Sequence, residues 1–249
     1  MYIPATLVSV DYYAFAYCKK LSDFTLGEGS VLKGIYEGAF YGCEALQSIE
    51  IPDGVVEIGE YAFYGCEALN SVDIKETSNL QGIYAHAFDY TGLTEFTIPD
   101  TVNEVGQYAF AHGKYTQFTT GTGLKEIEEG ILFSNDKKSE ITLKHLNNCD
   151  YATLKYLFGN ENSSEKAIPQ TLKDVTVANA TIIPEGYFRN YEYIEKVTLN
   201  DVQTIGVEAF AGCKDLKEVT GSESLTSIEE KAFYGCTELT SIENLEQVK

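Results

Sequence analysis

The chain contains one phrase written twice in a row. Residues 35–51 read IYEGAFYGCEALQSIEI, and residues 58–74 read IGEYAFYGCEALNSVDI. The step from Phe40 to Phe63 is 23 residues. Self-similarity at a period in the twenties is typical of a solenoid, in which each unit buries its apolar face on its neighbours. The phrase therefore predicts a stack of short repeated units.

The same pattern extends over the whole chain and divides each unit into four parts. An aliphatic residue opens the unit, and a short Ala-Phe segment follows, often with a Gly-Cys pair. A stretch of period two such as Leu46-x-x-Ile49-x-Ile51 predicts a strand, and a turn closes the unit. We expect about ten units, spaced 22 to 30 residues apart, whose central residues are Phe15, Phe40, Phe63, Phe88, Phe110, Leu132, Phe158, Phe188, Phe210 and Phe233.

These parts predict one parallel sheet, with short helical turns on the opposite side and a continuous inner stack of phenyl rings. Gly42 and Gly65 suit the left-handed residue that ends a helical turn. Pro52, Pro99 and Pro169 each stand directly after a predicted strand, where a residue without an amide proton is tolerated. The expected class is therefore α/β, rich in β-structure, with strands stacked in register.

Residues 1–249 read as one solenoid domain with truncated units at both ends, which we interpret as a piece of a longer protein. One unit is longer than the rest. Residues 144–167 contain a stretch whose apolar positions suit two helical turns, followed by the polar run 160–166. A polar insertion in a repeat array maps to a surface loop, so this insertion is the expected place for a specialised site.

The composition excludes several kinds of partner. The chain has 18 Lys and Arg against 38 Asp and Glu, which gives a formal charge of −20. Nucleic acids and anionic lipids are both bound through basic patches, so neither is expected to bind here. No run approaches the roughly 20 apolar residues of a membrane span, and the N-terminus has no signal-peptide pattern.

The phrase Ile-x-x-x-Ala-Phe-x-Gly-Cys-x-x-Leu-x-x-Ile-x-Ile-Pro resembles the BspA-like leucine-rich repeats, and the likeness runs from Ile3 to Leu245. The resemblance implies a right-handed, arc-shaped leucine-rich-repeat solenoid. It also implies a surface-exposed or secreted protein of an anaerobic or host-associated microbe that binds host or bacterial partners. The family has no shared catalytic residues, so the resemblance implies no enzyme activity.

Cysteine and histidine offer the only candidates for chemistry, and neither pattern is convincing. Five of the six cysteines lie three residues after the Phe of their unit, a repeated position that suits a small buried hydrophobe. Pairing of Cys43 with Cys66 stays open as the alternative. His86, His112 and His145 lack metal-ligand spacing and a recurring acid partner. We therefore expect no catalytic residue, metal site or cofactor.

The outward positions of the predicted strands form the candidate binding surface. If Ile49 and Ile51 point inward, Ser48 and Glu50 point outward, and the equivalent positions down the array carry eight acids, one base and a row of threonines. The plainer interpretation of this pattern is a soluble, exposed sheet without a ligand, and it stays open beside the binding surface. With Tyr151 of the insertion, the candidate partner-binding residues are Glu50, Asp73, Glu95, Gln117, Glu140, Asp174 and Lys196.

We expect a non-enzymatic, monomeric interaction or adhesion module that binds a protein or a glycan through this acidic sheet face and the insertion. The 18 tyrosines, against no tryptophan, suit either a contact surface or the rim of a thinly covered solenoid. The alternative function is a structural spacer that holds other domains away from the cell surface and has no ligand of its own.

Overall fold

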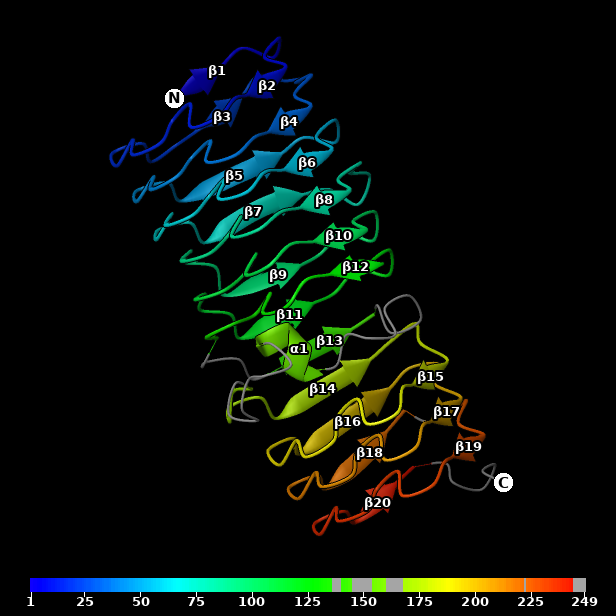
Figure 1. Cartoon of the computed structure of the whole chain (residues 1–249). Coiled ribbons are helices and arrows are strands. Elements are labelled where there is room, and N and C mark those ends of the chain that lie inside the picture. Colours follow the sequence, from blue (N-terminus) through cyan, green and yellow to red (C-terminus); the bar gives the residue numbers. More distant parts are fainter. Residues whose placement is uncertain (136–139, 145–153, 160–167, 222, 244–249) are drawn as a thin grey trace.

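The computed structural model describes residues 1–135, 140–144, 154–159, 168–221 and 223–243. Each turn pairs with the turns before and after it through parallel strands, and the turns stack into an elongated molecule (Figure 1). The predicted parallel-strand solenoid is therefore confirmed. Within these ranges, no helix is long and apolar enough to cross a membrane.

The strands form two rows along the stack. In the first strand row, side chains alternate as predicted, since Ile49 and Ile51 are buried whereas Ser48 and Glu50 are exposed. This row consists of β1 (Tyr2–Ile3), β3 (Thr25–Leu26), β5 (Ser48–Ile51), β7 (Ser71–Ile74), β9 (Glu95–Thr97), β11 (Gln117–Thr119), β13 (Glu140–Leu143), β14 (Asp174–Val177), β16 (Lys196–Leu199), β18 (Glu218–Thr220) and β20 (Ser241–Ile242).

The prediction of a single sheet is wrong, because the aliphatic residue that opens each unit is also extended and pairs with its equivalents. Ile35, for example, lies opposite Ile58 in the next turn. The resulting second strand row is a six-stranded and a three-stranded sheet. It consists of β2 (Ser9–Val10), β4 (Gly34–Ile35), β6 (Glu57–Ile58), β8 (Gly82–Ile83), β10 (Glu104–Val105), β12 (Glu126–Ile127), β15 (Ile182–Ile183), β17 (Thr204–Ile205) and β19 (Ser227–Ile228).

The short helical turns predicted at the Ala-Phe segments are not confirmed. Main-chain hydrogen bonds there alternate between neighbouring turns and the same turn. The Phe40 amide donates to the Ala62 carbonyl one turn on (2.8 Å), whereas the Tyr64 amide donates back to the Tyr61 carbonyl (3.1 Å). Tyr61 and Gly65 have φ angles of 55° and 70°. A right-handed helix needs negative φ throughout, so these segments are a series of tight turns.

The count of ten units is not confirmed either, since the stack has about 9 turns. The unit predicted around Phe158 contributes the short helix α1 (Leu154–Phe158) and, within the described ranges, no strand of the second row. The Leu132 amide donates to the Leu157 carbonyl (2.7 Å), so this segment occupies the place of an Ala-Phe segment. The helical prediction for this stretch is thus confirmed for the five residues of α1.

The core lies between the two strand rows and contains the predicted stack of phenyl rings, but in two runs. The rings of Phe40 and Phe63 lie 5.2 Å apart at an angle of 4°, and those of Phe188 and Phe210 lie 4.9 Å apart at 3°. The first run extends from Phe15 to Phe110 and the second from Phe188 to Phe233. Leu132 carries no ring, and the stack is therefore not continuous.

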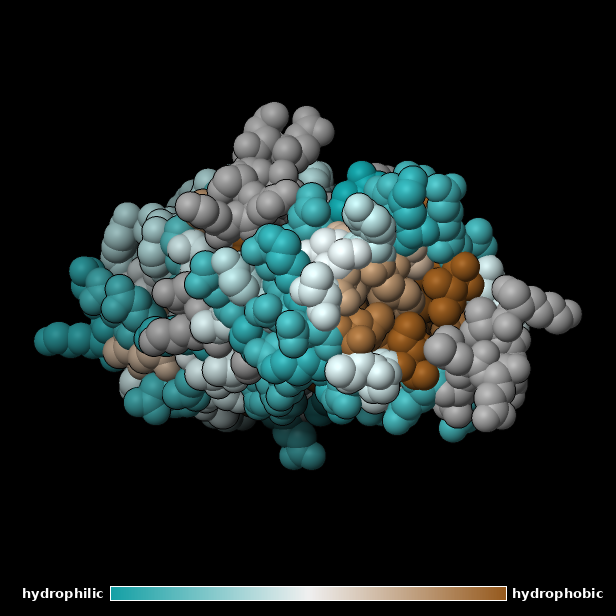
Figure 2. All heavy atoms as spheres, turned by 90° about the horizontal axis from the view of Figure 1, so that it is seen from below, coloured by the Kyte–Doolittle hydropathy of each residue, from teal (hydrophilic) through white to brown (hydrophobic). Residues whose placement is uncertain are grey.

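The core reaches the surface at the last described turn. Ile228, Phe233, Leu239 and Ile242 are only partly buried, although they belong to the same apolar core as the inner turns. Figure 2 looks onto this end of the stack and shows apolar side chains gathered within a hydrophilic border. Each turn covers its neighbour's apolar face, and the last described turn has a described neighbour on one side only.

Candidate functional site

The outward side chains of the first strand row lie in register from β9 to β20. Glu95, Gln117, Glu140, Asp174 and Lys196 follow one another on successive strands. Next to this row of charged residues runs a row of threonines at the equivalent positions Thr97, Thr119, Thr142, Thr176, Thr198 and Thr220. Five of the predicted binding residues are thus brought together on what we call the acidic face.

The other predicted residues lie elsewhere. Glu50 and Asp73 face each other across β5 and β7, but these two strands form a separate sheet, and the pair takes the position of the threonine row. Lys75 lies 3.6 Å from Glu50 and partly neutralises it. Tyr151 lies outside the described residues.

Repulsion between carboxylates is concentrated in the middle of the acidic face. Burial raises the pKa of Asp174, and the neighbouring Glu140 raises it further, whereas Lys196 acts in the opposite direction. Gln117 donates from Nε2 to Glu140 Oε2 (2.9 Å). The acids of this central part therefore share one amide donor and one nearby ammonium, and a cation placed there would be attracted.

Basic residues balance the acids toward the C-terminal end. Lys196 Nζ lies 2.9 Å from Glu218 Oε1, and Glu195 accepts from both Lys173 (3.1 Å) and Lys217 (2.5 Å). The hydrogen bonds from Lys217 and Lys173 lower the pKa of Glu195. The negative field of the acidic face is therefore strongest over β9 to β14 and weakens from β16 onward.

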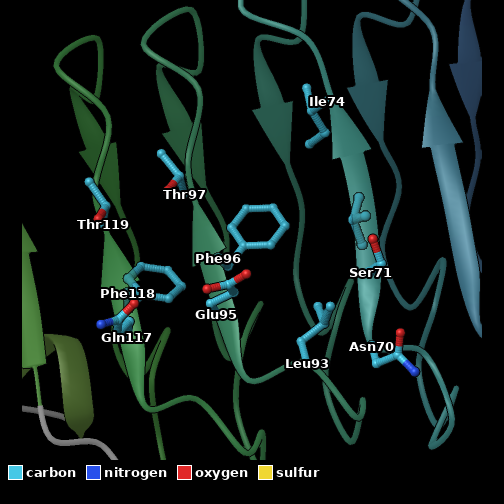
Figure 3. A pocket seen from close by; sticks show the side chains of 11 residues that line it. Asn70, Ser71, Ile74, Leu93, Glu95, Phe96, Thr97, Gln117, Phe118 and Thr119 are labelled. Carbon is cyan, nitrogen blue, oxygen red and sulfur yellow. The ribbon is translucent and has the colours of Figure 1, made fainter.

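The first strand row is interrupted between β7 and β9. In the described chain, no main-chain hydrogen bonding pairs these two strands. A cleft of about 300 Å³ lies at the interruption, and Figure 3 shows the Phe96 ring on the β7 side of its strand. A second hollow of about 450 Å³ continues beyond the strand ends and shares Ile74 and Thr97 with the first. The lining of the first includes Ser71, Val72, Ile74, Leu93, Glu95, Phe96 and Thr97.

The interruption was missed at the sequence level, although a signal for it exists. Ile58 follows Ile51 by 7 positions, whereas Ile83 follows Ile74 by 9. The segment that connects β7 to β8 is thus two residues longer than the segment that connects β5 to β6. The turn after β3 is lengthened in the same way, and β3 is likewise not paired with β5. Both interruptions of the first strand row thus follow a lengthened connection, while the second strand row stays paired there.

A histidine–carboxylate cluster on the Ala-Phe side was also missed. Asp89 is 1% exposed, and its two oxygens bind Nδ1 of His86 (2.7 Å) and Nδ1 of His112 (2.9 Å). Each imidazole also stacks on a tyrosine, His86 on Tyr61 (4.8 Å) and His112 on Tyr90 (4.2 Å). The two histidines occupy different places in their units, so only the stacking of adjacent turns shows that one acid serves both.

Three of the five cysteines at the repeated position are buried as predicted. These are Cys43, Cys66 and Cys213, whereas Cys18 is exposed and Cys236 is only partly buried, and all described cysteines are unpaired. The Cys66 thiol donates to the Phe40 carbonyl (3.2 Å), and the Cys213 thiol donates to the Phe188 carbonyl (3.2 Å). Burial raises the pKa of the Cys43 thiol to about 11, so it stays protonated and unreactive at neutral pH.

No constellation for metal binding is found in the part of the chain that the structure describes, since no three His, Cys, Asp or Glu side chains are grouped to hold an ion. The His86–Asp89–His112 cluster commits both Nδ1 atoms to the carboxylate. What the geometry offers is therefore a charged, ordered surface with a cleft beside it.

Several solved structures are similar to this chain. The pneumococcal vaccine antigen PcpA is 24% identical, with a TM-score of 0.48, over 96% of this chain and 54% of that protein. This chain thus spans about half of its length. A leucine-rich-repeat protein from Bacteroides ovatus is 19% identical, with a TM-score of 0.48, over 100% of this chain and 82% of that one.

A leucine-rich cell surface protein from Faecalibacterium prausnitzii is 20% identical, with a TM-score of 0.40, and the match covers 97% of this chain and 78% of that one. No curated protein matches this chain significantly. The family model of the BspA type leucine rich repeat region matches residues 1–116, 81–179 and 181–249, in six copies. Together with the repeated turns described above, this match shows that the chain belongs to the BspA-type leucine-rich-repeat family.

Proposed function

We propose that this chain is a non-enzymatic binding module of a cell-surface or secreted protein and that its acidic face binds a partner protein with a basic surface. The observation that carries the proposal is the in-register row from Glu95 to Asp174, which places carboxylates on three of four successive strands with little compensation. Leucine-rich-repeat solenoids are typically scaffolds rather than enzymes. The similarity to a vaccine antigen and a cell surface protein agrees with a location outside the cell.

The acidic face suits a large, ordered contact surface. Its side chains extend from strands of one seven-stranded sheet, in which β11 to β16 are hydrogen-bonded on both sides, so binding requires little ordering of the main chain. Complementary charge across an interface speeds association and selects the partner. The threonine hydroxyls of the adjacent row can donate and accept hydrogen bonds. A protein that presents lysine or arginine side chains at similar spacing would satisfy both rows.

The test compares two triple variants with equal changes of charge. E95Q/E140Q/D174N neutralises the acidic face, whereas E60Q/E67Q/E223Q neutralises three exposed carboxylates outside it. Both are incubated with an array of purified extracellular-matrix proteins and a glycan array, at about 50 and about 300 mM NaCl, because salt screens attraction between exposed charges. We expect the first variant to bind basic proteins at least roughly tenfold more weakly than the wild type, and the second to bind normally.

The outcome separates binding from a spacer function. Equal binding by the wild type and E95Q/E140Q/D174N would show that the acidic face is not the contact surface. A wild-type chain that retains nothing on either array would instead favour the spacer, whose outward residues serve only solubility. Binding to neutral glycans that is insensitive to salt would contradict the choice of a basic protein partner.

A further inference from the structure

The interruption between β7 and β9 leaves main-chain groups directed into the cleft. In a parallel ladder, both main-chain groups of a residue point toward the same neighbouring strand, and successive residues alternate. The Ile98 amide donates to the Thr119 carbonyl on the following turn (2.9 Å), so Glu95 and Thr97 direct theirs toward β7. Ile74 is the equivalent of Ile98 one turn earlier. By the same alternation, Val72 and Ile74 therefore direct their main-chain groups toward β9.

The two strand edges also expose apolar side chains that are buried elsewhere in the row. Val72 and Ile74 are partly exposed, whereas Ile49 and Ile51 at the equivalent positions of β5 are 3% and 1% exposed. The floor of the cleft is formed by Leu93 and Phe96. A ligand lying in the cleft would cover these apolar side chains and meet unpaired main-chain groups on both sides.

Negative charge borders the opening of the cleft. Asp73 points outward from β7, and Glu95 points outward from β9. Ser71 and Thr97 occupy the remaining outward positions beside the cleft. Ser71 is level with Glu95, and Asp73 is level with Thr97. An outward side chain between the two strands would thus have a carboxylate on one side and a hydroxyl on the other, and lysine or arginine would fit best.

We propose that the cleft between β7 and β9 binds an extended peptide segment of a partner protein, which adds a strand to the interrupted row. Its apolar side chains pack against Val72, Ile74 and Phe96, and its alternate basic side chains point outward to Asp73 and Glu95. Strand addition of this kind takes its affinity from main-chain hydrogen bonds and its specificity from alternate side chains. The inference rests on the proposed binding function of the same side of the molecule and specifies the form of the partner.

The alternation of the cleft favours a peptide over other ligands. A glycan has no regular series of donors and acceptors that matches two strand edges, and it does not alternate apolar and basic groups. A folded basic surface would contact the acidic face without entering the cleft. Only an extended chain brings main-chain donors and acceptors, inward apolar groups and outward charges at the two-residue period of a strand.

The probe for this proposal is a capped synthetic peptide with the sequence Lys-Val-Lys-Val-Lys-Val-Lys. A second peptide carries N-methyl groups on its three valines, which removes amide donors but keeps the charge and the side chains. Binding to the folded chain is measured by isothermal titration calorimetry. We expect the methylated peptide to bind at least roughly tenfold more weakly, because main-chain hydrogen bonds supply most of the affinity.

Two protein variants locate the binding. V72F places a ring in the cleft without changing any charge, and we expect it to weaken peptide binding at least roughly tenfold while its circular dichroism melt stays close to the wild type. D73N/E95Q removes the two flanking carboxylates and should weaken binding several-fold. E60Q/E67Q makes the same change of charge at two exposed carboxylates outside both strand rows, and we expect it to change binding by less than about twofold.

The results separate this proposal from the proposed function. Equal binding of the two peptides, no binding of either, or full binding by V72F would overturn strand addition. If the acidic-face variant still lost its basic partners in that case, the acidic face would stand and only the cleft would be excluded. If peptide binding held while the acidic-face variant bound normally, the cleft would stand and the broad charged surface would not.

Discussion

The Ala-Phe segments of the first and last turns have the same backbone but present different side chains. In the first turns aromatic rings lie on one another, as Tyr41 does on Tyr64 at 4.8 Å and Tyr61 on His86 at 4.8 Å. In the last turns, the equivalent surface holds the ion pair of Arg189 and Glu208 at 2.7 Å. The backbone is therefore determined by something that the two regions share.

What they share is the inner ring stack and the hydrogen bonds between turns. Phe63 in the first region and Phe210 in the last region both stack between two other phenyl rings. Their amides donate to the Ala87 and Ala232 carbonyls at 2.8 Å in both cases. The comparison teaches that the inward residues set the fold, whereas outward residues on the same backbone can vary between an aromatic and a charged surface.

The largest expected effect tests whether the core is equivalent in the two regions. Phe63→Ala and Phe210→Ala each remove a fully buried ring, and we expect each to lower the free energy of unfolding by about 3–5 kcal/mol. Urea denaturation followed by circular dichroism measures both. A large loss for one variant and a small loss for the other would show that the two ring stacks are not equivalent.

The next effect concerns the buried carboxylate, which has no counterpart in the last turns. Asp89→Ala removes the shared acceptor of His86 and His112, and we expect a loss of about 2–3 kcal/mol, because two partly buried donors lose their buried partner. Arg189 occupies the same place in its unit as Asp89, one residue after the core Phe. Arg189→Ala breaks an ion pair at the surface and should cost less than about 1 kcal/mol. Similar losses in urea denaturation would contradict the distinction between a buried cluster and a surface pair.

A matched pair of glycine variants should give effects of opposite sign. Tyr61 and Lys231 both lie two residues before the core Phe and both have φ of 55°. Glycine relieves this conformation at either place. Lys231→Gly should therefore change stability by less than about 0.5 kcal/mol or raise it slightly, whereas Tyr61→Gly also loses ring contacts with Tyr64 and His86 and should cost about 1 kcal/mol. Equal changes in melting temperature would show that the stacked rings contribute nothing.

The smallest effect appears in the pH dependence of stability on the acidic face. The pKa of Asp174 is raised in the folded chain, so the folded state keeps its proton to a higher pH than the unfolded state does. The free energy of unfolding therefore falls as the pH rises from about 3.8, the ordinary pKa, through the raised pKa. Asp174→Asn should therefore be more stable than the wild type at pH 7 by a few tenths of a kcal/mol, since solvent screens this exposed group. At about pH 3 the two should be equal.

Glu195 supplies the opposite sign for the same measurement. Lys217 and Lys173 lower the pKa of Glu195 in the folded chain. The ionised Glu195 therefore stabilises the fold at pH values above its pKa in the unfolded chain, and this stabilisation is lost as the pH falls through its pKa in the folded chain. Glu195→Gln should reduce stability at pH 7 and match the wild type at low pH. Thermal melts at several pH values measure both variants, and changes of the same sign would contradict the assigned charges around them.

Much of this architecture could be predicted from the repeated phrase. The inward positions of the strands, the stacked rings at Phe40 and Phe63 and the buried thiols all follow from residues that recur at one position of each unit. The register of the acidic face followed for the same reason, because equal spacing places Gln117 opposite Glu140. Each of these features depends on which residue stands at one position of every unit, and such a repeated position can be recognised in the sequence directly.

The features that were wrong or missed depend on how one turn meets the next. The second strand row pairs residues such as Ile35 and Ile58. Its strands are only two residues long in each unit, which is too short to show an alternating pattern. The tight turns replace the predicted helical turns because every second amide bonds to the next turn instead of along the chain. The cleft beside Phe96 follows a connection that is longer by two residues, and the spacing alone does not display how the next strand is placed.

The sequence by itself determined that the chain is a stack of BspA-type turns with an acidic strand surface and a core of phenyl rings, because each unit repeats the chemistry that buries one face on its neighbour. Only the tertiary structure decided that Asp89 joins two histidines of adjacent turns and that the first strand row opens between β7 and β9. Both depend on displacements between turns. Spacing along the chain records how many residues a turn contains, but the packing of each turn on the next decides where they lie.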